Sequence, residues 1–203
     1  IKLRGADHIT FDSLTIHADG GAFGYGVQLV SNADSNTFRK CNIITNDAST
    51  STSYAGVVIN ATEAGPIALG NTLCDGNTFD RSTVTGGYYG FTVVGSAATL
   101  IENNKFTNNT VNDFYSTGFY VAGTNNTLIE GNTISRPVRS TFHPSQNAGL
   151  FATRAASNNL YISKNRIRNL FGGNPLATQS QYGIYFNAND ADAGSHNVVS
   201  NNL

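Results

Sequence analysis

Residues 127–134 read Thr-Leu-Ile-Glu-Gly-Asn-Thr-Ile, and this stretch indicates the fold. Its core is an apolar residue, two variable positions, an Asn, one variable position and a second apolar residue. The frame occurs seven times, at intervals of 27 to 36 residues. The residues at its middle position are Asp12, Cys41, Asn77, Asn104, Asn132, Asn165 and Asn201. Self-similarity at such a period is typical of stacked repeat architectures.

A second motif precedes every copy except the first: a Gly followed by an apolar-x-apolar triplet. These glycines are Gly26, Gly56, Gly90, Gly118, Gly149 and Gly183. Apolar and polar residues alternate over short segments, which predicts strands, and polar turns separate them. Two packed antiparallel sheets would also give short alternating strands, but not one frame repeated seven times. The pattern therefore predicts an all-β parallel β-helix of about seven coils, with equivalent side chains stacked about 4.8 Å apart.

The repeated Asn predicts an asparagine ladder, that is, one file of amides along the axis. Asn tolerates the left-handed backbone conformation of a tight bend better than most residues. Its amide can both donate to and accept from the neighbouring coil. Asp12 and Cys41 depart from the rule, and we expect the ladder to be weakest there.

Residues 118–134 show both motifs in their most regular form, and this combination resembles the parallel β-helix repeat of the pectin-lyase-like superfamily. The resemblance covers nearly the whole chain and implies a right-handed coil of three short sheets in an extracellular setting. Residues 9–16 are similar to coils of large secreted bacterial surface proteins. We interpret residues 1–203 as a single β-helix domain. Because Met is absent, we expect it to be a segment of a longer chain or a processed product.

The composition argues against several functional classes. Charged residues make up 12% of the 203 residues, the net charge is −1, and aromatic residues make up 10%. This balance does not suggest disorder or nucleic-acid binding. No apolar run approaches the roughly 20 residues of a membrane-spanning helix, so membrane insertion is not expected. Cys41 and Cys74 are interpreted as small buried apolar residues.

The Gly-containing strand presents its middle residue outward, and three of these residues suggest a binding face. Coil by coil they are Gln28, Val58, Thr92, Tyr120, Phe151 and Tyr185. The last three rings would stack into a platform for sugar rings. The resemblance implies that glycan chains lie on this sheet. Arg136, Arg139, His143 and Arg154 lie in or near the adjoining segments and would bind an acidic or neutral glycan. Alternatively, these rings only pack on each other beneath the loops.

No catalytic constellation is evident. Glycoside hydrolysis needs two carboxylates that face one bond, and the outward column contains none. Asp75, Glu102 and Glu130 share one frame position and would form a row able to bind calcium, or else a solvated acidic stripe. No other cofactor is indicated.

These observations favour a secreted structural or adhesive segment that binds a polysaccharide or cell-surface glycan. One alternative is a polysaccharide lyase or glycoside hydrolase whose catalytic residues lie in other coils. The other is end-to-end self-association through unpaired strand edges.

Overall fold

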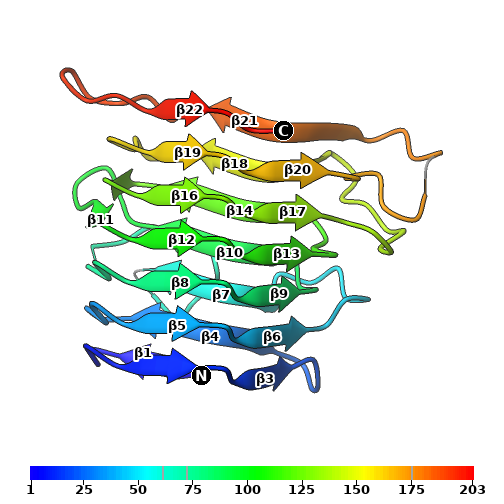
Figure 1. The fold of residues 1–203 in the computed structure, drawn as a ribbon, viewed down its shortest axis with the longest axis horizontal. Coiled ribbons are helices and arrows are strands. Elements are labelled where there is room, and N and C mark those ends of the chain that lie inside the picture. The colour runs from blue at the N-terminus through cyan, green and yellow to red at the C-terminus, as the bar shows by residue number, and fades with distance from the viewer. Residues whose placement is uncertain (61, 72, 175) are drawn as a thin grey trace.

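The structure is a computed structural model that describes residues 1–203 except 61, 72 and 175. The chain winds into a column of stacked coils, with β1 near one end and β22 at the other (Figure 1). Three parallel sheets form its sides. Seven strands in the first sheet delimit about six full turns, slightly fewer than the seven coils predicted.

Each sheet takes one strand from each successive coil. Sheet A contains β1 (Lys2–Arg4), β4 (Gly24–Val30), β7 (Tyr54–Asn60), β10 (Tyr89–Val94), β14 (Thr117–Ala122), β18 (Gln146–Thr153) and β21 (Ser180–Asn187). Sheet B contains β2 (Thr10–Asp12), β5 (Thr37–Arg39), β8 (Thr78–Asp80), β12 (Lys105–Thr107), β16 (Leu128–Glu130), β19 (Tyr161–Ser163) and β22 (Val198–Ser200). Sheet C contains β3 (Thr15–Ala18), β6 (Asn42–Thr45), β9 (Thr83–Thr85), β13 (Thr110–Asn112), β17 (Thr133–Ser135) and β20 (Arg166–Arg168).

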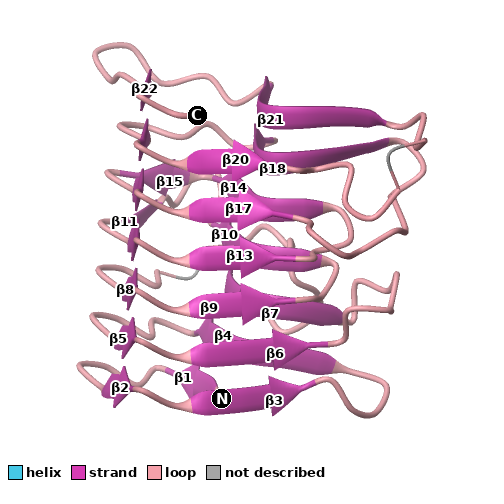
Figure 2. Cartoon of the chain, turned by 45° about the vertical axis from the view of Figure 1, so that its right-hand side comes forward, coloured by secondary structure: helices cyan, strands magenta, loops and turns pink. Residues whose placement is uncertain are grey.

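A short fourth sheet pairs β11 (Ile101–Glu102) with β15 (Thr124–Asn125). Figure 2 shows the long connections projecting from the column beside the sheets.

The core is a set of apolar files that run along the axis inside the three sheets. In sheet B, the rings of Phe11, Phe38, Phe79 and Phe106 stack with centroid separations of 4.6, 4.8 and 5.7 Å. In sheet A, Phe91 and Phe119 stack at 4.6 Å. These separations follow the spacing of parallel strands, so each coil buries its apolar residues against the coils above and below.

The repeated glycine is explained by the close approach of sheets A and C. A Cβ atom added at Gly118 would lie 2.7 Å from the Cγ2 atom of Ile134 in sheet C and 2.5 Å from the carbonyl oxygen of Gly149. Similar clashes arise at Gly26, Gly56, Gly90 and Gly149. Because the obstacles include backbone atoms, a methyl group could not be accommodated by rotation of a side chain.

Gly118→Ala should therefore lower the free energy of unfolding by about 1–3 kcal/mol, because the added methyl group overpacks the junction of sheets A and C. Gly183→Ala is the matched control, since nothing lies within 4 Å of a Cβ at that position. Denaturant unfolding of the two variants and the wild type measures the difference. Equal stability of the two variants would contradict the steric explanation.

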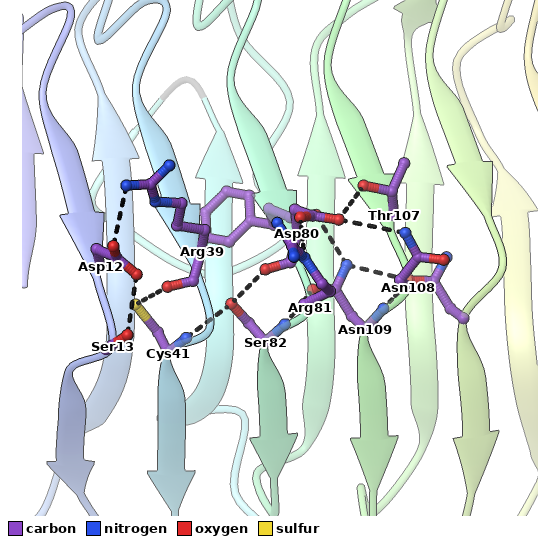
Figure 3. Close-up of polar contacts among 12 residues, drawn as sticks. Asp12, Ser13, Arg39, Cys41, Asp80, Arg81, Ser82, Thr107, Asn108 and Asn109 are labelled. Atoms are coloured by element: carbon purple, nitrogen blue, oxygen red, sulfur yellow. Dashed lines mark hydrogen bonds and ion pairs between the residues drawn. The ribbon is translucent and has the colours of Figure 1, made fainter.

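Buried polar side chains form two files, one at each end of the sheet B strands. The first precedes sheet B and contains Asn36, Asn77 and Asn104. The second follows sheet B and contains Cys41, Ser82, Asn109, Asn132, Asn165 and Asn202 (Figure 3 shows its first three members). In each file, the side-chain acceptor receives a hydrogen bond from the backbone N–H of the preceding coil's member, at 2.8–3.1 Å.

The prediction of a single ladder is therefore wrong. Asn77 and Asn104 belong to the first file, whereas Asn132 and Asn165 belong to the second. Cys41 lies in the second file, but Asp12 lies within β2 and pairs with Arg39 at 3.0 Å. Asn201 is exposed, and its neighbour Asn202 is the file member.

At every predicted position except Asn201, the left-handed conformation belongs to a different residue from the one predicted. In the turn before the second file, φ is positive at Lys40, Arg81, Asn108, Gly131 and Lys164, each one residue ahead of the file member. The bend and the amide are thus separate requirements at adjacent positions. The amide is buried, and the bend residue is free to carry an outward side chain.

Asn132→Ala should lower the free energy of unfolding by about 2–4 kcal/mol, because it leaves buried backbone groups without partners. The Asn132 amide donates to the carbonyl oxygen of Phe106 at 2.9 Å and accepts from the N–H of Asn109 at 2.8 Å. Asn187→Ala, at an exposed position at the end of β21, should change stability by less than about 0.5 kcal/mol. Thermal unfolding compares them, and a similar loss in both variants would contradict the role of the file.

Candidate functional site

The outer face of sheet A contains a hollow because small residues interrupt a file of large ones. The residue before each repeated glycine faces outward, and in coil order these residues are Tyr25, Ala55, Tyr89, Thr117, Ala148 and Tyr182. Thr117 and Ala148 occupy the two positions after Tyr89 in this file. On the same two strands, β14 and β18, Tyr120 and Phe151 also face outward, three residues further along the chain. The two small side chains therefore form the floor of a recess between rings.

The recess is a pocket of about 200 Å³. Its lining combines the rings of Tyr88, Tyr89, Tyr120 and Phe151, the floor residues Thr117 and Ala148, and Ser116, His143 and Ser145 at the sides. The loop between β17 and β18 supplies His143 and Ser145. We call this the aromatic pocket.

Edge-to-face contacts hold the rings of the aromatic pocket in place. Tyr89 and Tyr120 lie 5.5 Å apart with an interplanar angle of 65°, and Tyr120 and Phe151 lie 5.7 Å apart at 88°. The His143 ring lies 5.9 Å from Tyr88 and from Tyr115. Such packing fixes the ring orientations before any ligand arrives.

The polar side chains of the aromatic pocket carry hydroxyl groups and one imidazole. The backbone N–H of Ser145 donates to Nδ1 of His143 at 3.3 Å, so a neutral imidazole carries its proton on Nε2. Burial raises the pKa of the Tyr88 and Tyr89 hydroxyls, which keeps both phenols protonated. Aromatic rings beside hydroxyl groups suit a ligand that presents apolar faces edged by hydroxyl groups.

The predicted ring platform is stacked in register but only partly open. Tyr120 pairs with Phe151, and Phe151 pairs with Tyr185, along sheet A. Phe151 and Tyr185 stack at 4.9 Å and are partly exposed, whereas Tyr120 is only 4% exposed. Tyr120 therefore contributes a wall to the pocket rather than an open surface, because loop residues cover it.

Arg136 and Arg139 do not face the pocket, which corrects their assignment as ligand-binding residues. Arg136 is fully buried, and its guanidinium donates to the carbonyl oxygens of Phe114, Leu170 and Thr141. Burial and the neighbouring Arg139 lower the pKa of Arg136 to about 10. Arg139 is 5% exposed and donates to the carbonyl oxygens of Asp113 and Ser49. Both side chains therefore connect loop segments through hydrogen bonds to backbone carbonyl oxygens.

Arg154 is exposed and directly follows β18. Its Nη1 atom donates to the carbonyl oxygen of Ile67 at 3.0 Å. Burial raises the pKa of Tyr120, and Arg154 partly opposes this effect. Arg154 therefore lies close to the aromatic pocket, although it does not line it.

The three acids predicted in one row fall into two files. Asp75 accepts a hydrogen bond from the backbone N–H of Glu102 at 2.7 Å, so these two are neighbours. Glu130 lies in sheet B beside Thr107 and Ser163 and pairs with Lys164 at 3.3 Å. Within the part of the chain that the structure describes, no three His, Cys, Asp or Glu side chains group as a metal site. The expectation of a calcium site formed by this row is therefore wrong.

Comparison with known protein families identifies the family of the chain. Residues 72–203, more than half of the sequence, match the family model of the right-handed β-helix region. The chain belongs to the right-handed β-helix family. No curated protein and no solved structure matches this β-helix. Among its described residues, no helix is long and apolar enough to cross a membrane.

Sequence reasoning missed most of the residues that line the pocket of this β-helix. Three of them, Tyr89, Thr117 and Ala148, immediately precede a Gly-apolar-x-apolar triplet, and Tyr88 lies one residue earlier. Reading the position before each glycine as an outward file would have revealed the alternation of large and small side chains. Ser116 occupies the same frame position as Tyr88, two residues before the glycine, whereas Ser145 carries no comparable signal because a loop positions it.

Asp75→Asn should stabilise the β-helix at pH 7, and the gain should vanish below about pH 4. Desolvation, together with the charges of Asp34 and Glu102, raises the pKa of Asp75. The folded state therefore binds this proton more tightly than the unfolded state, so ionisation of Asp75 opposes folding at neutral pH. The cost disappears as the pH falls through the folded pKa. The Asn side chain retains an acceptor for the Glu102 N–H.

Asp80→Asn is the control with the opposite sign. Although burial raises the pKa of Asp80, hydrogen bonds from Arg81, Thr107 and Asn108 outweigh it and lower the pKa. This variant should lose stability at pH 7 and match the wild type at acidic pH. Denaturant midpoints between pH 3 and pH 8 give the comparison. Destabilisation by Asp75→Asn at pH 7 would refute the electrostatic interpretation.

Proposed function

We propose that this β-helix is a rigid carbohydrate-binding segment of a secreted or cell-surface protein, and that the aromatic pocket holds one sugar ring. The observation that carries the proposal is a pocket of about 200 Å³ whose rings stand beside hydroxyl groups and one imidazole. A sugar ring has apolar C–H faces and a hydroxyl-bearing edge. Aromatic faces can pack on the former, while polar groups bind the latter.

The pocket's chemistry supports binding rather than hydrolysis. Its described lining residues include no carboxylate, whereas glycoside hydrolysis generally uses two carboxylates flanking the bond. Two serines, a threonine, three tyrosines and a histidine supply hydrogen-bonding groups. A neutral sugar ring is favoured over a charged one, because the described lining of the pocket includes no Lys, Arg, Asp or Glu side chain.

The backbone beneath the pocket supports the same conclusion. Tyr89, Thr117 and Ala148 lie on consecutive strands of sheet A, held by parallel pairing. A site built on paired strands loses little conformational freedom when a ligand binds, so more of the contact energy remains as affinity. Loop residues then shape the sides of the pocket and its selectivity.

Binding to a panel of immobilised neutral and acidic glycans tests the proposal. Tyr88→Ala should weaken retention roughly tenfold, because it removes a packing ring. Ala148→Leu should abolish retention by filling the floor of the pocket. Tyr161→Ala is the matched control, since it removes a 38% exposed ring from sheet B and should leave binding unchanged.

Circular dichroism establishes that each variant is folded before binding is compared. If the wild type retains no glycan on the panel, the proposed function fails. It also fails if Ala148→Leu, while folded, retains glycan as well as the wild type does.

A further inference from the structure

Residues 62–71, which we call the strap, leave the end of β7 and cross the outer face of sheet A. Glu63 pairs with Lys2 at 2.6 Å and with Arg4 at 2.9 Å, both on β1. The carbonyl oxygen of Ile67 accepts from Arg154, which directly follows β18. Because β1 and β18 are five strands apart in sheet A, these anchors span roughly 24 Å of the face.

The strap covers a surface that adjoins the aromatic pocket. Ile67 packs on an outer apolar cluster that includes Val58 and Tyr120. Thr92 lies between these two residues in the outward file of sheet A. Val58 and Thr92 are both 0% exposed although they point away from the core of the column. Their burial therefore depends on what lies over the sheet.

Thr92 is also polar and unsatisfied. Its Oγ1 atom is buried and has no hydrogen-bond partner among the described residues. A buried hydroxyl without a partner is disfavoured, and native structures contain few such groups. A hydroxyl facing outward on a sheet beside a ring-lined pocket is placed to bond a ligand rather than to stabilise the core.

We propose that the strap is a releasable cover over a concealed extension of the aromatic pocket. When the strap lifts, Val58 and Thr92 join Tyr120 as one continuous groove along sheet A. On the basis of the proposed function, the groove then accepts a longer hydroxyl-bearing ligand, with Thr92 as a polar contact. The closed strap restricts binding to the pocket itself.

The ion pairs that attach the strap to β1 are exposed and weak. Lys2, Arg4 and Glu63 have side chains between 40% and 69% exposed, so their ion pairs are weak and screened by salt. Arg154 is also exposed. Leu69 is 40% exposed, so apolar burial adds little at that point of the strap. The buried Asn60 amide, which donates to the carbonyl oxygen of Gly65, and the packing of Ile67 remain to be broken, but these are few beside the contacts that hold the coils.

Thiol labelling of Thr92→Cys measures the opening without any glycan, so its result is independent of the proposed function. The native Cys41 and Cys74 are free and buried inside the column, and they report unfolding in the same molecule. Position 92 should react with a maleimide much faster than either native cysteine. Raising the salt concentration to about 1 M should accelerate only position 92.

Releasing the anchors should have the same effect as salt. In the Thr92→Cys background, Glu63→Gln combined with Arg154→Met should raise the labelling rate at position 92 roughly three- to tenfold. Glu130→Gln removes an exposed ion pair on sheet B and is the matched control, with no change expected. Val58→Cys reports on the same surface if Thr92→Cys does not fold.

Two results overturn the proposal. If position 92 reacts as slowly as Cys41 and Cys74 in every background, the strap does not open separately from the coils. If it reacts rapidly without any response to salt or to the anchor variants, the strap does not cover it.

Discussion

Hydrogen bonds made by the two files of buried polar side chains fix the position of each coil relative to the next. The other features of the structure depend on this constraint. Asn132 accepts from the coil before it, where Asn109 donates, and its own backbone N–H donates to Asn165 in the coil after it. A shift by one residue would leave these buried groups unpaired, at a cost of about 1–3 kcal/mol each. The register is therefore the same on every side of the column, and rings, glycines and aliphatic residues recur above their counterparts.

Because of the same constraint, the position of a residue within the repeat determines where its side chain lies on the surface. Because strands of sheet A pair in register, two small residues on consecutive coils, Thr117 and Ala148, leave a recess beside the rings of Tyr89, Tyr120 and Phe151. Loops then determine what the recess becomes. The segment containing His143 closes one side, and the strap covers the neighbouring face through Ile67. The coils supply rigidity, and the irregular connections supply selectivity.

The sequence was sufficient for the fold class because one frame recurs at a near-constant interval, and only stacked coils place such repeats equivalently. It was insufficient to separate the two amide files. A strand of sheet B spans three residues, so an Asn just before it or two residues after it is followed two positions later by an apolar residue. Asn104 and Asn132 therefore satisfy the same frame. The ring file along sheet A was readable for the same reason as the fold. The burial of Tyr120, Arg136 and Arg139 was not, since it depends on loop paths fixed by long-range contacts such as that between Arg139 and Ser49.

The most direct test of the two-file arrangement is hydrogen exchange of the side-chain amides, followed by NMR. We predict that the NH₂ groups of Asn104 and Asn132 exchange orders of magnitude more slowly than that of the exposed Asn187. Nuclear Overhauser contacts should connect the side chain of Asn132 with those of Asn109 and Asn165, and that of Asn104 with Asn77. Rapid exchange at Asn104 and Asn132, or a contact network that joins Asn104 directly to Asn132 in one file, would contradict the account.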